Sequence, residues 1–192
     1  MSDLAAMRVA LDLLHAPARV HTARTQPLPE GVHLLLRIAA GDEEAEREAA
    51  ESTGRPSRVL RQAAGFYIEQ ILFSAESDAY RVLGSTPFAS PADLRRNLAY
   101  LLKWVHPDLE ENRNRSAFLK RVTAAWEEVK TPHRRKAYDA ALIAAAAQMP
   151  APYADDPRRS SWPSSPSRAH RDKQPLFNRV VDFARTILVR NR

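Results

Sequence analysis

The stretch LRRNLAYLLKWVHPD, residues 94–108, decides the fold of this chain. Its apolar residues recur at helical spacing and predict a core-facing stripe made of Leu94, Leu98, Leu101, Leu102 and Val105. The three cations Arg95, Arg96 and Lys103 fall away from that stripe and predict a basic exposed face. His106 should end the helix, because the residue before a proline is biased away from helical geometry. Pro107 then fixes a turn, and Asp108 is left in a loop where its carboxylate can accept hydrogen bonds from an arginine.

A second amphipathic helix is expected after this turn, over about residues 116–130. Its apolar positions are Phe118, Val122, Ala125, Trp126 and Val129, and they would pack on the first helix. The two helices then form an antiparallel hairpin with His106-Pro107-Asp108 at one end. A short helix over residues 78–83, ended by Gly84, should precede the hairpin, and a helix over residues 134–147, anchored by Tyr138, should follow it. The predicted fold class is all-α.

The order and spacing of these segments resemble the J-domain of DnaJ-type cochaperones over roughly residues 78–142. The matching motifs are DAYRVLG at 78–84, HPD at 106–108, VTAAWEEV at 122–129 and RRKAYD at 134–139. In that family the loop tripeptide and the basic face of the second helix dock on a DnaK-type chaperone and stimulate its ATP hydrolysis. The resemblance therefore implies a cochaperone that stimulates and localises such a chaperone and is not itself an enzyme. It assigns chaperone binding to His106, Pro107, Asp108, Arg95, Arg96 and Lys103.

The chain departs from the family pattern in the middle of the second helix. The family usually has an aromatic residue followed by two basic residues where this chain has Leu98, Ala99 and Tyr100, and a lysine and a tyrosine where it has Trp104 and Val105. Missing mid-helix charges weaken the electrostatic part of docking. The sequence after residue 142 shows neither a Gly/Phe-rich segment nor a β-rich client-binding pattern, which favours a specialised cochaperone over a general one. Two alternatives stay open: a degenerate J-like scaffold or regulatory protein without ATPase stimulation, and a basic-tailed protein associated with nucleic acid or a membrane.

The segments around the J-like part have their own patterns. Residues 1–26 read as a short helix and a linker, with Leu4, Met7, Leu11 and Leu14 on one helical face and the linker from residue 18. Residues 27–77 read as a module of three helices, with Asp42 and Ser57 as N-caps and Gly54 as a stop. The J-like segment is expected over residues 78–147.

Two further segments are expected at the C-terminal side. Residues 148–175 are rich in Pro, Ser and Arg and predict a disordered linker. Residues 176–192 predict an amphipathic helix with a cationic polar side. Its residues 176–190 would either fold back on the helical core or contact a membrane surface or a partner groove.

Composition narrows the function classes. The net charge is +6, but residues 1–77 carry 8 basic and 11 acidic side chains, residues 78–150 carry 12 and 8, and residues 151–192 carry 9 and 4. Any anionic partner should therefore meet the J-like part and the tail first. The chain has no cysteine, its histidines lack ligand spacing, and it has no glycine-rich phosphate loop, so we expect no cofactor, no metal and no small-molecule substrate. No secretory signal or long apolar run is visible, and the expected location is the cytoplasm.

Overall fold

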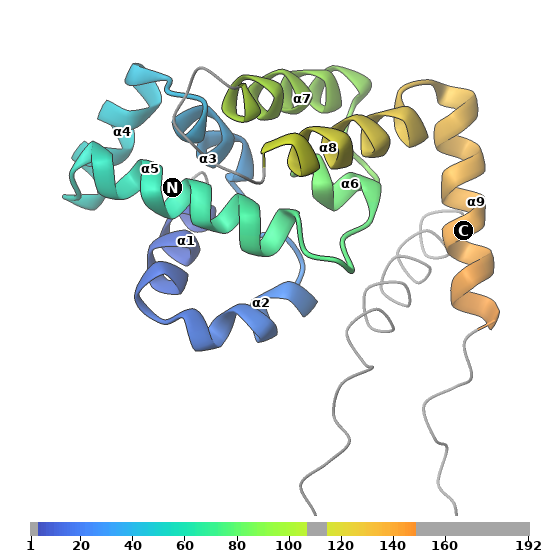
Figure 1. Cartoon of the computed structure of the whole chain (residues 1–192), viewed down its shortest axis with the longest axis horizontal. Coiled ribbons are helices and arrows are strands. Elements are labelled where there is room, and N and C mark those ends of the chain that lie inside the picture. The colour runs from blue at the N-terminus through green and yellow to red at the C-terminus, as the bar shows by residue number, and fades with distance from the viewer. Residues whose placement is uncertain (1–3, 107–114, 149–192) are drawn as a thin grey trace, which may run out of the picture. The chain divides into compact units, whose positions relative to one another are not determined.

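The structure is a computed structural model that describes residues 4–106 and 115–148, and every regular element within these ranges is a helix (Figure 1). The all-α fold class is thus confirmed. Pro107 and Asp108 lie outside the described residues. So do the predicted linker beyond Gln148 and the predicted amphipathic helix at residues 176–192.

The N-terminal segment is more ordered than its sequence suggests. Helix α1, Ala5–His15, buries Ala6, Met7, Ala10 and Leu13, so its core face is rotated from the predicted one. The linker predicted from residue 18 is wrong, because a 3-10 turn at Pro17–Arg19 leads directly into helix α2, Val20–Thr25. Val20 is buried there and Arg24 donates a hydrogen bond to the Gln70 carbonyl at 2.8 Å, so tertiary contacts offset the weak helical periodicity of the segment.

The expected three-helix module is present as α3, Val32–Ala39, α4, Glu43–Thr53, and α5, Ser57–Tyr67. Asp42 caps α4 as predicted, since its carboxylate accepts a hydrogen bond from the Ala45 amide at 3.1 Å. Gly54 ends the helix in the left-handed conformation. The predicted cap at Ser57 is wrong, because α5 begins at Ser57 itself and the position before it is Pro56. A π-helical turn, Ile68–Leu72, continues α5.

The helical hairpin follows this module. Helix α6, Ala79–Val82, is capped by Asp78, and α7, Pro91–Val105, is capped by Ser90. Helix α8, Arg115–Val129, lies beside α7 (Figure 1), and α9, Pro132–Gln148, begins after a short turn. These elements agree with the sequence prediction to within a few residues.

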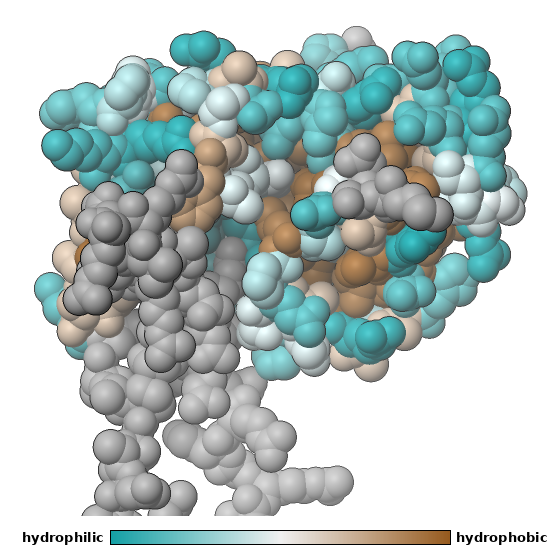
Figure 2. Space-filling model, turned by 180° about the vertical axis from the view of Figure 1, so that it is seen from behind, coloured by the Kyte–Doolittle hydropathy of each residue, from teal (hydrophilic) through white to brown (hydrophobic). Residues whose placement is uncertain are grey.

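The N-terminal helices and the hairpin share one compact unit, residues 1–138, and residues 139–192 form a second unit. Within the first unit, α1 packs on α5, and α3 lies between α5 and α7. The face opposite to the one in Figure 1 has hydrophilic side chains along its edges and apolar side chains towards its middle (Figure 2). In the described ranges no helix is long and apolar enough to cross a membrane.

Candidate functional site

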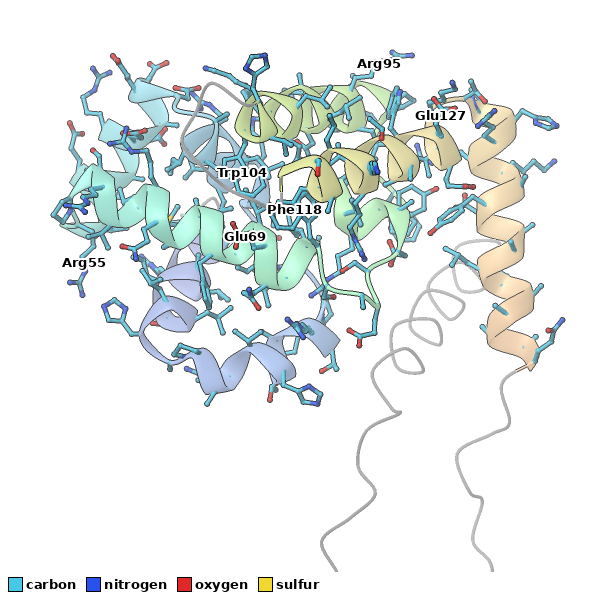
Figure 3. The ribbon with its side chains drawn as sticks, viewed as in Figure 1. Arg55, Glu69, Arg95, Trp104, Phe118 and Glu127 are labelled. Atoms are coloured by element: carbon cyan, nitrogen blue, oxygen red, sulfur yellow. The ribbon has the colours of Figure 1, made fainter. Side chains whose placement is uncertain are left out.

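The basic face predicted for α7 is present. Arg95, Arg96 and Lys103 are all exposed, and Arg95 extends away from the helix bundle (Figure 3). Arg96 is ion-paired with Asp93 one turn earlier, so part of its charge is neutralised within the helix. Arg95 and Lys103 therefore contribute most of the positive field on this face.

His106 lies where α7 ends. Its backbone leaves helical geometry with ψ 135°, while its amide still donates a hydrogen bond to the Lys103 carbonyl at 3.2 Å. This confirms the predicted helix exit before Pro107. The His106 side chain is exposed, so a partner that approaches this end of the hairpin can contact the imidazole.

The predicted core stripe of α7 is correct at most positions and wrong at one. Leu94, Leu101 and Val105 are buried and Leu98 is half-buried, but Leu102 is 37% exposed. Asn97 is buried in its place. The core-facing side of α7 is therefore rotated towards Asn97, and the rotation brings Leu102 to the surface.

Asn97 joins three helices. Its amide nitrogen donates to the carbonyls of Leu83 and Gly84, each at 3.1 Å, just beyond the end of α6. Its amide oxygen lies 3.3 Å from Nδ1 of His33 in α3. Sequence periodicity could not reveal this role, because an asparagine among leucines reads as a polar position on the outer face.

His33 also contacts Tyr100 edge to face, with the two ring centroids 5.4 Å apart. Tyr100 stands where the J-domain pattern carries its second mid-helix basic residue, and α3 covers it here. The neighbouring Ala99 is exposed. The two residues at the family's mid-helix basic positions thus differ in exposure: Tyr100 is covered by the N-terminal module, and Ala99 faces outward.

Burial lowers the pKa of His33 below its ordinary value of 6.5, and the nearby Arg96 and Arg37 act in the same direction. The hydrogen bond to Asn97 and the carboxylate of Asp93 oppose this shift. Below pH 6.5 the unfolded chain therefore binds a proton at this position more readily than the folded chain, and folding loses free energy.

Above about pH 6.5 we expect the titration of His33 to leave the free energy of unfolding unchanged. As the pH drops below that value, the His33 titration should lower the free energy of unfolding, until the pH reaches the lowered pKa of the folded state. His33→Phe keeps an aromatic ring against Tyr100 and removes the titration, so its stability should fall less over the same interval. Urea unfolding of both proteins between neutral and mildly acidic pH measures this difference. Parallel stability curves would contradict the prediction.

An aromatic cluster supports the end of α7 next to His106. Trp104 stacks on Phe118 of α8 with ring centroids 5.9 Å apart, and both rings contact Phe73. Trp104 also lies against Gly65 of α5, where an added Cβ would be 3.9 Å from the indole Nε1. Figure 3 shows Trp104 and Phe118 close together between α5 and the hairpin. The cluster ties both ends of the loop that carries the tripeptide to the N-terminal module.

Tyr138 anchors the start of α9 to α6, as predicted for the last helix. Its hydroxyl accepts a hydrogen bond from the Ala79 amide at 2.8 Å, and its ring contacts Tyr80 edge to face. Arg135 lies over the Tyr80 ring and donates to its hydroxyl at 3.2 Å. These contacts give part of the cationic run 134–136 a structural role.

The described residues include no group of three or more His, Asp or Glu side chains that could hold a metal ion. The site offers a surface with the exposed imidazole of His106, exposed cations along α7, and an aromatic cluster that packs behind them. Such a surface is suited to binding another macromolecule.

Comparison with known proteins identifies the segment that carries this surface. The DnaJ domain family matches residues 78–139. These residues form a DnaJ domain. Chaperone protein DnaJ of Rickettsia akari (strain Hartford) and that of Rickettsia felis (strain ATCC VR-1525 / URRWXCal2) are each 34% identical to the chain over 62 residues. The alignment covers 32% of this chain and 17% of each relative, and no solved structure matches.

The matched DnaJ domain begins at the cap of α6 and ends one residue after Tyr138. The resemblance expected over residues 78–142 is therefore confirmed. In this chain, α3 and α5 pack on the DnaJ domain through Asn97, Tyr100 and Trp104.

Proposed function

We propose that the chain is a specialised cochaperone whose DnaJ domain engages a DnaK-type ATPase chaperone and stimulates its ATP hydrolysis. The observation that carries this proposal is the DnaJ domain match together with an exposed His106 at the end of a helix that exposes Arg95 and Lys103. The chain then acts through its partner and catalyses no reaction itself.

The chemistry of the surface supports this role. Exposed arginine and lysine on one helical face attract an acidic surface and accelerate the encounter, while contacts at the helix end fix the orientation. His106, Pro107 and Asp108 are proposed as the orienting contacts, and Arg95, Arg96 and Lys103 as the electrostatic ones. Because Arg96 is paired with Asp93, its replacement should matter less than that of Arg95.

The test is steady-state ATP turnover by a DnaK-type chaperone with and without this protein. We expect the wild type to accelerate turnover and His106→Gln to abolish the acceleration without loss of stability, because His106 is exposed and its replacement opens no cavity. His133→Gln is a matched control, since His133 is also exposed but lies at the other end of the hairpin. A folded wild type that leaves turnover unchanged with several chaperones would favour the alternative, a DnaJ-like scaffold without stimulation.

Three finer points belong to the same proposal. We propose the cytoplasm as the location of this activity. Residues 176–190 are proposed as a peripheral contact with an anionic membrane or a partner groove. Their sequence predicts a helix with an apolar face and with Arg179, Arg185 and Arg190 mostly on the polar side. We also propose that the segments of the chain end at residues 26, 77, 147 and 175, as expected from the sequence.

A further inference from the structure

Four residues on the exposed side of α7 form a narrow stripe along the helix. Arg95, Ala99, Leu102 and His106 follow one another at intervals of four, three and four residues, so they lie on the same face of the helix. All four are exposed. The stripe starts with a cation, continues with two apolar side chains and ends at the imidazole.

The N-terminal module limits this stripe on one side. His33 of α3 covers Tyr100, and Trp104 is turned towards α5 and the aromatic cluster. Asn97 is buried below them. A partner cannot reach this flank without displacing a packed interface, so contact with α7 has to be made on its exposed side, which includes the stripe and the neighbouring Lys103.

The middle of the stripe is apolar where a purely electrostatic surface would be charged. Leu102 is one of the few large apolar side chains that are exposed in the described ranges, together with Phe88, Leu119 and Ile143. Ala99, one turn before it, has a side chain small enough to let a partner approach the helix closely. An apolar centre within a charged rim is the usual anatomy of a protein interface.

We propose that Leu102 is the apolar anchor by which the DnaJ domain binds its DnaK-type chaperone, with Ala99 admitting the partner's surface and Arg95 and Lys103 at the rim. The inference rests on the function proposed above and adds a specificity-determining residue to it. The cationic rim suits an acidic surface around an apolar pocket on the chaperone. Because α3 covers Tyr100, the middle of α7 offers a partner the apolar Ala99 and Leu102 and no charged side chain.

This apolar contact has a measurable signature. Salt screens exposed charges over a distance of about 8 Å at physiological ionic strength, whereas burial of apolar surface is not weakened by it. Binding of the wild type should therefore retain most of its affinity when the salt concentration is raised. Loss of Leu102 should lower the affinity at every salt concentration.

The experiment measures chaperone affinity and ATP turnover of the full chain for wild type, Leu102→Ser, Ile143→Ser and His106→Gln, at low and high salt. Ile143 is the matched control. It is an apolar side chain of the same size on helix α9, and its exposed fraction of 37% equals that of Leu102. We expect Leu102→Ser to bind about tenfold more weakly, the usual scale for a central apolar contact, and Ile143→Ser to bind like the wild type.

The outcomes separate the two proposals. Wild-type affinity of Leu102→Ser, beside a clear loss for His106→Gln, would overturn the anchor and leave the cochaperone function standing. An equal loss for Leu102→Ser and Ile143→Ser would also overturn it, since the effect would then be general. A wild type that neither binds nor stimulates the chaperone would overturn both.

Discussion

Arg81→Met is expected to destabilise the protein by about 3 kcal/mol or more, because three backbone carbonyls each lose a hydrogen bond from a charged group worth about 1.5–3 kcal/mol. The guanidinium is only 2% exposed and donates to the carbonyls of Gln26 at 2.8 Å, Ala23 at 3.1 Å and Ile71 at 3.3 Å. Methionine preserves much of the apolar stem but has no donor. Removal of the desolvated charge offsets only part of the loss.

Urea unfolding of Arg81→Met and Arg95→Met measures the effect. Arg95 is the control, since it lies on a helix of the same domain but is exposed, and its replacement should change stability by less than about 0.5 kcal/mol. Equal stabilities for the two variants would show that the Arg81 hydrogen bonds contribute nothing net. Arg81→Lys should recover only part of the stability, because one ammonium group cannot reproduce the fork of the guanidinium.

The second large effect is expected at Gly84. This residue ends α6 with φ +60°, and a Cβ added to it would lie 3.0 Å from Cγ1 of Val32 and 3.1 Å from Cδ1 of Leu36. Gly84→Ala therefore combines left-handed strain of about 1–2 kcal/mol with overpacking of about 1–3 kcal/mol. The sum, roughly 2–5 kcal/mol, is a large part of the 5–15 kcal/mol that holds a typical domain together.

Gly41→Ala separates the two contributions. Gly41 also ends a helix, with φ +72°, but a Cβ there would meet no atom within 4 Å. The stability loss of Gly41→Ala should therefore come from left-handed backbone strain alone. Thermal unfolding of both variants then gives the packing contribution at Gly84 by difference, and a Gly84→Ala variant no less stable than Gly41→Ala would refute the close contact between α6 and α3.

The fold of the hairpin could be predicted because its signals are local. Asp78 and Ser90 cap the helices that follow them, Gly84 ends α6, and the proline at 107 sets the helix exit at His106. Each of these depends on residues within one helical turn of the feature. The family motif adds the order of the helices, which local patterns alone do not give.

The contacts between the module and the DnaJ domain could not be predicted, because they join residues far apart in the sequence. Arg81 reads as a surface cation until the carbonyls around Gln26 are placed beside it. Leu102 reads as part of the core stripe until Asn97 is seen to take the buried position. The segment of α2 reads as a linker because its helix depends on packing and has almost no amphipathic pattern of its own.

The close contact of α3 with Gly84 also bears on how the chain is made. Val32 and Leu36 leave the ribosome some fifty residues before Gly84, the residue they pack against. At a synthesis rate of about 5–20 residues per second, Gly84 is synthesised roughly 2 to 10 seconds after these apolar side chains. During that interval the nascent N-terminal module shows the kind of apolar surface that chaperones recognise, before the domain proposed to recruit one has been translated.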